Sequence, residues 1–300
     1  MKTYHTEKRR PIRGIMHAAA LLALAAATML TSCHDWKRTG GNAENDSTAT
    51  APTTPRDTLR FDTISLHRNV SVLPPRPLPK YSIDMCLNFA QGDSPQAWAF
   101  NQCVCRMLFA IEGQTPEEAM THFADSLANQ FSQELRDFYE PDDEDGAYRF
   151  TYTWKMTGEL SEKPLDGIVG YEAKLETYQG GAHGSYVLSY LNFDETEGFL
   201  DKWDVFQEDK MPAVIEALTQ QLLADNGCKS LDELIEETSI TMLGDIFVEN
   251  NFLIQRDGIC FIYNQYEIAP YSAGLISIFL GYDKLRDFLR PEFAARIPKS

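Results

Sequence analysis

Two short segments carry side chains whose types and spacing could contact a ligand. The first, residues 178–184, reads Tyr-Gln-Gly-Gly-Ala-His-Gly. Gly180, Gly181 and Gly184 permit positive φ, so we expect them to form a tight turn that holds His183. The imidazole either contacts a ligand or metal ion, or bonds to loop carbonyl groups. A metal needs further ligands, and because no His-x-x-His or Cys-x-x-Cys supports one, we favour the second interpretation.

The second segment, residues 263–274, reads Tyr-Asn-Gln-Tyr-Glu-Ile-Ala-Pro-Tyr-Ser-Ala-Gly. Its Glu267 lies between two tyrosines and precedes a proline. The carboxylate either accepts backbone N–H groups at a strand end or belongs to a polar, aromatic recognition edge. Tyrosines recur at interfaces and stack on sugar faces, which keeps the second alternative open. The candidate binding residues are therefore Tyr178, His183, Tyr263, Tyr266, Glu267 and Tyr271.

No catalytic motif accompanies these residues. The sequence has no Gly-x-Ser-x-Gly, no His-Glu-x-x-His and no phosphate-binding loop. The acidic run at 142–146 lacks the alternating ligand spacing of a calcium loop and is interpreted as a solvated turn. We predict no catalytic residue, no metal and no cofactor, and a protein that is not an enzyme. The alternative is a peptidoglycan-modifying enzyme that uses Glu267 or His183.

Covalent chemistry is predicted at Cys33. Five basic residues precede an apolar run, 15–30, which is short for a membrane span and suits a secretory signal. The run ends in Leu-Thr-Ser-Cys, which resembles the lipobox of bacterial lipoproteins, whose cysteine takes diacylglycerol before cleavage. We predict a signal peptide over 1–32 and membrane attachment through acyl chains such as palmitate on Cys33. An uncleaved anchor with an incidental cysteine is the alternative.

A flexible, lipid-anchored tether is predicted over residues 33–80. Gly, Ser, Thr and Pro dominate this stretch and leave few apolar side chains to pack. Three Asp-Ser/Thr triplets, at 46–48, 57–59 and 62–64, resemble acceptor sites for O-glycans in some Gram-negative envelope proteins. Chance occurrence in a Ser/Thr-rich stretch is the alternative.

The charge is distributed unevenly along the 300 residues. The whole chain has 44 acidic and 27 basic residues, a net charge of −17. Residues 1–80 contain twelve basic and six acidic residues, so residues 81–300 keep 15 basic and 38 acidic ones, a net charge of −23. This balance argues against nucleic acid as a partner, because phosphates repel acidic proteins. A field of this sign attracts basic proteins.

The periodicity of the apolar residues predicts the helices and strands that position the candidate residues. Alternating or apolar runs predict strands at 81–89, 150–156, 169–175, 186–193, 252–255, 259–263 and 275–280. Helices are predicted at 94–108, 116–139, 211–224, 231–237 and 283–289, the second opened by a capping box at Thr115 and the last ended by Pro291. This order predicts an α+β fold of mainly antiparallel sheets with packed helices. We expect two joined modules, 81–178 and 179–300.

The two segments, about 80 residues apart, resemble signatures of the domain-of-unknown-function family 3298. This domain forms the extracytoplasmic part of RsiV-type anti-sigma factors, which sense lysozyme, and accompanies some peptidoglycan deacetylases. The resemblance implies an α+β, envelope-facing domain that binds proteins or glycans, preceded by its usual small module. A lipoprotein signal replaces the transmembrane helix and cytoplasmic segment of those proteins, so we expect no sigma factor as a partner.

Together these observations predict a lipid-anchored envelope protein, on the periplasmic or outer-membrane face, that binds its partners. The resemblance and the charge favour a lysozyme-like cationic protein, and the tyrosines favour cell-wall glycan. A structural envelope lipoprotein without either affinity is a further alternative.

Overall fold

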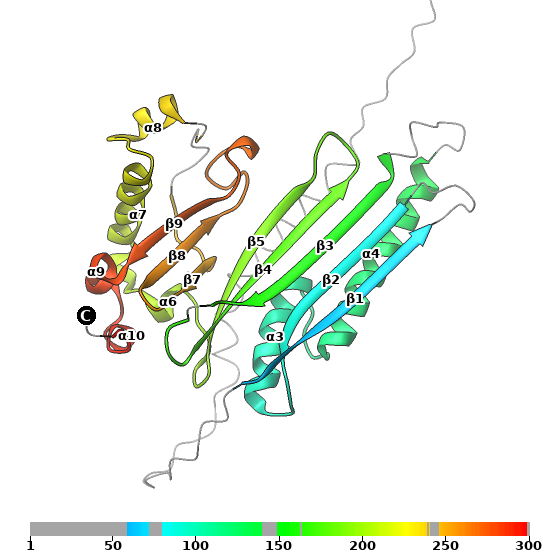
Figure 1. Cartoon of the computed structure of the whole chain (residues 1–300), viewed down its shortest axis with the longest axis horizontal. Helices are drawn as coiled ribbons and strands as arrows, with labels where there is room; N and C mark the ends of the chain where they lie inside the picture. Colours follow the sequence, from blue (N-terminus) through cyan, green and yellow to red (C-terminus); the bar gives the residue numbers. More distant parts are fainter. Residues whose placement is uncertain are drawn as a thin grey trace, which may run out of the picture.

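The computed structural model describes residues 59–71, 80–139, 149–162, 164–238, 240 and 246–298 (Figure 1). The predicted signal segment, Cys33, the triplet at 46–48, most of that at 57–59 and the acidic run at 142–146 lie outside these residues. Within the described ranges, no helix combines the length and the apolar character needed to cross a membrane.

The larger sheet contains six strands in sequential order. They are β1 (Phe61–Ser71), β2 (Lys80–Ala90), β3 (Thr151–Leu160), β4 (Ile168–Gln179), β5 (Ser185–Asp194) and the two-residue β6 (Gly198–Phe199). Neighbours pair antiparallel except β2 and β3, which are parallel. A parallel pair needs a long crossover. Helices α3 (Pro95–Phe109) and α4 (Pro116–Phe138) provide it and pack together against one face of the sheet (Figure 1).

Both crossover helices begin where their capping residues predict. The Ser94 side chain accepts a hydrogen bond from the Ala97 N–H, 3.1 Å away, and a proline follows at the first helical position. Thr115 and Glu118 form a reciprocal capping box at the start of α4. These bonds satisfy N–H groups that have no partner inside the helix.

The large sheet buries only one face over most of its width. Along β2, Ile83, Met85 and Leu87 are buried in a core with the apolar sides of α3 and α4. The alternate residues Asp84 and Cys86 are exposed on the opposite, open face. This alternation is the pattern of an antiparallel sheet with one solvated face.

The smaller sheet contains β7 (Phe252–Ile254), β8 (Gly258–Tyr263) and β9 (Ile276–Gly281), all antiparallel. The remaining helical elements are α6 (Lys202–Val205), η1 (Glu208–Lys210), α7 (Met211–Asp225), α8 (Leu231–Glu237), η2 (Tyr271–Ala273), α9 (Tyr282–Leu285), η3 (Arg286–Phe288) and α10 (Pro291–Ala294). One face of this sheet shares a core with α7 and the C-terminal helices. On the other face, Leu253 and Ile262 pack against Leu188 and Tyr190 of β5.

The α+β prediction is confirmed, and most predicted elements are present. The predicted tether differs, because residues 61–71 form β1 and pair residue by residue with β2. Ile64 and Leu66 there are half-buried against the large core, opposite Leu87 and Met85. The expected module boundary at 178/179 falls within the last two residues of β4, which pairs with β5.

The C-terminus also differs from its prediction. The helix predicted at 283–289 is divided between α9 and η3. Pro291 ends no helix there and instead begins α10, the position at which its fixed φ and missing N–H cost least.

Candidate functional site

The two signature segments meet in space. Residues 180–184 connect β4 to β5, and η2 lies in the connection between β8 and β9. The His183 ring stacks on the Tyr271 ring with centroids 4.0 Å apart and planes 25° apart. The Tyr271 hydroxyl donates a hydrogen bond to the Gly184 carbonyl at 2.9 Å. A contact between residues 88 positions apart therefore holds the two loops together.

The glycines of the first loop are required for two different reasons, positive φ and the close approach of a backbone carbonyl oxygen. Gly180 has φ +76°, and a Cβ there would lie 2.2 Å from the Arg149 carbonyl oxygen. Gly181 has φ +100° and open space around it. Gly184 was expected to use positive φ but does not. Its constraint is space, since a Cβ would lie 2.6 Å from the Thr177 carbonyl oxygen.

His183 is exposed at this junction, and its Nδ1 lies 3.0 Å from the Gly184 carbonyl oxygen. The loop carbonyl is therefore a partner of the imidazole, as one of the two interpretations expects. Among the described residues, no group of three or more His, Cys, Asp or Glu is arranged to hold a metal ion.

Three of the predicted tyrosines extend the aromatic surface around His183. Tyr271 lies 6.1 Å from Tyr266, ring centroid to ring centroid, and Tyr266 is 60% exposed. Tyr266 also has φ +71°, a backbone conformation that is uncommon for a non-glycine residue. Tyr178 donates from its hydroxyl to the Gly181 carbonyl at 3.0 Å, so it braces the first loop.

Tyr263 is buried and Glu267 is partly buried, so neither is as exposed as Tyr266. Tyr263 is 3% exposed and donates to the Phe247 carbonyl at 2.8 Å. Glu267 accepts the Asn264 backbone N–H at 2.7 Å, and burial raises the pKa of its carboxyl. These contacts close the β8–η2 connection. Of the six candidate residues, four therefore share one surface and two support it from within.

The aromatic surface borders an open groove of about 390 Å³ on the uncovered face of the large sheet. Its lining comes from three adjacent strands, the β4–β5 loop and η2: Thr153, Lys155, Glu176, Thr177, Tyr178, Gly184, Ser185, Tyr186 and Tyr271. The register of the sheet brings these residues together, since Lys155 pairs with Glu176 and Glu176 with Tyr186.

A row of alternating charges runs from the floor of the groove to the neighbouring Lys174. Glu176 Oε1 lies 2.8 Å from Lys174 Nζ, and Glu176 Oε2 lies 3.6 Å from Lys155 Nζ. The Lys174 hydrogen bond is the main reason that the pKa of Glu176 is lowered. Lys174 Nζ also lies 5.4 Å from the centroid of the Tyr186 ring, within range of a cation–π contact. Both lysines remain more than one-third exposed and can contact a ligand.

Sequence reasoning missed Lys155, Lys174, Glu176 and Tyr186. The available signal was strand alternation, which places alternate residues of β3, β4 and β5 on the face opposite the buried Trp154. Alternation selects the face, but the register that makes these residues neighbours depends on pairing between strands.

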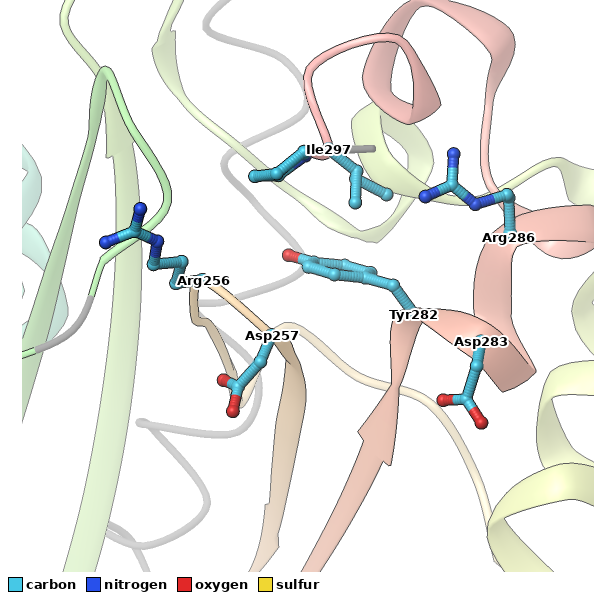
Figure 2. Close-up of a pocket in the computed structure, with 7 residues that line it drawn as sticks. Arg256, Asp257, Tyr282, Asp283, Arg286 and Ile297 are labelled. Carbon is cyan, nitrogen blue, oxygen red and sulfur yellow. The ribbon is translucent and has the colours of Figure 1, made fainter. Parts of the chain in front are cut away.

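A second hollow, of about 470 Å³, lies beside the β7–β8 turn and the C-terminal segment. Figure 2 shows the Tyr282 ring between the guanidinium groups of Arg256 and Arg286, with the carboxylates of Asp257 and Asp283 nearby. Tyr282 donates to the Gln255 carbonyl at 2.7 Å, and burial raises the pKa of its hydroxyl. None of the predicted candidate residues lines this hollow, so the groove remains the favoured site.

The family comparison concerns the second half of the chain. Residues 203–283 match the family described as "Protein of unknown function (DUF3298)". This part of the chain is therefore similar to the DUF3298 family. The matched residues include the second signature segment and begin after the first. The predicted family resemblance is thus confirmed, while the preceding module and the lipoprotein signal stay predictions.

Two crystal structures of DUF3298 family members share the fold of this chain. A protein from Bacteroides fragilis is 23% identical with a TM-score of 0.72, and the match covers 80% of this chain and 97% of that one. A protein from Pseudomonas aeruginosa is 18% identical with a TM-score of 0.54, and the match covers 82% of this chain and 99% of that one. No protein with a curated function matches the sequence.

Proposed function

We propose that this DUF3298 protein is an envelope-anchored binding protein whose groove recognises cell-wall glycan. One observation carries the proposal: the His183–Tyr271 stack and Tyr266 adjoin an open groove lined by Lys155 and Glu176. Lys174 lies beside the groove and pairs with Glu176. Aromatic rings offer flat apolar surface for sugar faces, and the charged and hydroxyl groups offer hydrogen bonds to sugar hydroxyls.

The shape of the site favours an extended ligand. Small-molecule sites usually enclose most of their ligand. This groove lies open across β3, β4 and β5, with its aromatic side at η2. A polymer can lie along such a surface and contact several side chains without entering a cavity. We propose that the groove binds without turnover, since its ion-paired Glu176 has a lowered pKa and is poorly suited to donate a proton.

The proposed location depends on the N-terminal segment. Acylation at Cys33 would attach the chain to a membrane of the envelope, and residues 34–58 would place the folded part at a distance from the lipid surface. The groove would then face the peptidoglycan compartment.

The test is a binding measurement with the full chain in mild detergent and soluble peptidoglycan fragments. Tyr266→Asn removes an exposed ring with a residue that tolerates positive φ, and Lys155→Ala removes one charge from the floor. Each change is expected to weaken binding by roughly tenfold or more. Trp98→Ala, which removes a 46% exposed ring from α3 on the covered face, is the matched control.

If glycan affinity is unchanged in both variants, the glycan-binding site lies elsewhere on the chain. Absence of any glycan affinity in the wild-type chain would reject the proposal. If the wild-type chain releases new fragment ends during the measurement and Glu267→Gln does not, the result would favour a peptidoglycan-modifying enzyme.

A second candidate function, binding of a lysozyme-like cationic protein, rests on a different surface. Residues 208–237, covering η1, α7 and α8, contain eight acidic and two basic residues, most of them exposed. A basic partner would be attracted to this helical layer, with affinity that falls as salt rises.

Charge reversal separates the two candidates. Asp232→Lys with Glu236→Lys is expected to weaken lysozyme binding while Tyr266→Asn leaves it unchanged. Retention of lysozyme by both variants, or none by the wild type at low salt, would reject this second candidate. A chain with neither affinity that co-purifies with fixed partners would be the structural lipoprotein.

A further inference from the structure

The two long edges of the six-stranded sheet differ in whether their outward backbone groups already have hydrogen-bond partners. Along most of β5, asparagine amides occupy the backbone groups that a further strand would use. Asn264 accepts the Leu188 N–H and Asn251 accepts the Tyr190 N–H, both at 2.8 Å. Asn251 also donates to the Leu188 carbonyl at 3.0 Å. This edge is closed to another strand.

The opposite edge is β1, an 11-residue strand at the end of the sheet order. Just before this strand, the Arg60 backbone carbonyl accepts the Gln91 N–H at 2.7 Å, so the even-numbered residues bond to β2. Antiparallel strands alternate their bonding direction, so residues 63, 65, 67 and 69 direct their N–H and C=O groups outward. Among the described residues, only the Asp62 carboxylate bonds an outward group, the Thr63 N–H at 2.8 Å.

We propose that β1 pairs antiparallel with β1 of a second copy of this chain, with Ser65 opposite Ser65. A long edge with unpaired backbone groups is a template for another strand. The two-fold axis of this pairing is perpendicular to the sheet, so both copies keep α3 and α4 on the same face. The result is one continuous sheet through both subunits.

The side chains of β1 select this register. Only the odd-numbered residues have outward backbone groups, so an odd-numbered residue of one copy must lie opposite an odd-numbered residue of the other. Allowed registers therefore differ by shifts of two residues. With Ser65 at the centre, Asp62 faces Arg68 of the second copy and Ile64 faces Leu66 of the second copy, each twice. Centring on Leu66 sets Arg68 against Ile64, and centring on Ile64 sets Arg68 against Arg60. Only the Ser65 register among these pairs opposite charges together and apolar side chains together.

The exposure and charge of the edge fit a second copy. Ile64 and Leu66 are only half-buried within one chain, and pairing would cover them. The Arg68 side chain is 46% exposed and 3.5 Å from Asp125, so it can also reach a neighbouring carboxylate. Residues 59–71 contain two arginines and one aspartate in a chain of net charge −17. Two acidic copies can therefore approach each other along this strand with little repulsion.

Two opposite charge changes test the register. In Asp62→Arg, every Arg68 faces another arginine, and in Arg68→Asp, every Asp62 faces another aspartate. We expect each variant alone to lose self-association by at least roughly tenfold. An equimolar mixture restores both opposite-charge pairs, so we expect it to recover the dimer. The measurement is sedimentation velocity of the full chain in mild detergent, with mixing of the two variants.

Glu159→Arg makes the same type of charge change at an exposed position of β3, away from the edge, and should leave the dimer unchanged. Thermal unfolding of each variant shows whether the monomer remains folded. A monomeric wild type up to its solubility limit would overturn the proposal. A dimer unchanged by both substitutions, or not recovered on mixing, would overturn it too.

Discussion

The two sheets of this protein face different surroundings. The small sheet is covered on both faces, by α7 and the C-terminal helices on one side and by β5 on the other. The large sheet is covered by α3 and α4 on one face, while much of its other face is open. Coverage explains their sequences, because a strand buried on both faces can be apolar throughout, whereas a half-buried strand must alternate.

This difference in coverage limits where a ligand can bind. In β8, Ile259, Phe261 and Ile262 are all buried, and Cys260 between them is partly buried. In β3 and β4, every second residue reaches the open face, and Lys155 and Glu176 stand there. The small sheet therefore supports the two loops, and the large sheet contributes the contact surface between its strands and Tyr271.

The largest effects are expected from the two cores. Phe100→Ala removes a fully buried ring that contacts Tyr171 and Phe193 under the large sheet, and Phe252→Ala removes its counterpart under the small sheet. Each should lower the free energy of unfolding by about 3–5 kcal/mol in urea titrations. Hydrogen exchange should increase first in the sheet that was changed. If both sheets lose protection against hydrogen exchange equally, they unfold as one cooperative unit and the distinction between them does not hold.

The join between the sheets gives the next largest effect. The buried Asn192 side chain donates to the Phe252 carbonyl at 2.7 Å and accepts the Ile254 N–H at 2.8 Å. Asn192→Ala leaves both backbone groups buried without these partners and should cost about 2–4 kcal/mol. Asn88→Ala, whose amide donates to Thr63 on the open face, is the control and should cost about 1 kcal/mol or less. If both variants lose a similar free energy of unfolding, the hydrogen bond on the open face contributes as much to stability as those that join the two sheets.

A pH dependence is expected at Asp194, where the large sheet meets Arg296 near the C-terminus. Burial alone would raise the pKa of this carboxyl, but the N–H groups of Glu197 and Thr196 and the Arg296 guanidinium outweigh burial and lower it. The group therefore stabilises the fold above its ordinary pKa of 3.8, and this contribution is lost as pH falls through the lowered pKa.

Asp194→Asn should cost about 1–2 kcal/mol at neutral pH and make the acid side of the stability–pH curve shallower. Urea titrations over a range of pH values measure both effects. Glu197→Gln, at an exposed position in the same turn, should leave the curve unchanged. An unaltered acid limb in the Asp194 variant would show that another carboxyl controls it.

The smallest effect on stability is expected on the open face. Lys155 is 64% exposed, and its 3.6 Å contact with Glu176 is a surface ion pair. Lys155→Ala should change the free energy of unfolding by less than about 0.5 kcal/mol. Thermal unfolding measures it beside the binding assay. A large loss of stability would assign this residue a structural role and weaken the contrast between the faces.

Local signals in the sequence predicted the elements that they control. The Thr115 capping box and Pro116 mark the start of α4, and Asp257-Gly258 marks the β7–β8 turn. β1 was missed because its few apolar residues follow a long Pro/Ser/Thr-rich stretch, and pairing with β2 is what orders them. The parallel β2–β3 pair was also beyond local signals, because strand direction depends on the α3–α4 crossover.

The candidate site was predicted in part. Aromatic and glycine content identified both loops, and the stack of His183 on Tyr271 joins them. The groove floor was not predicted, because Lys155, Glu176 and Tyr186 come from three strands and become neighbours only through register. Backbone contacts at the β8–η2 connection separated Tyr263 and Glu267 from the other candidates, although all six looked equivalent in the sequence.

Four features follow from the sequence alone: the helix starts, the faces of the strands, the tight turn at Gly180 and the concentration of negative charge after residue 80. Each of these depends on neighbours within a few residues or on composition alone. Which loop residues are exposed depends instead on tertiary packing. The Asn264 amide bonds to Leu188, 76 residues away, and anchors the second loop on β5. Such contacts form only when distant segments have packed, so no local pattern contains them.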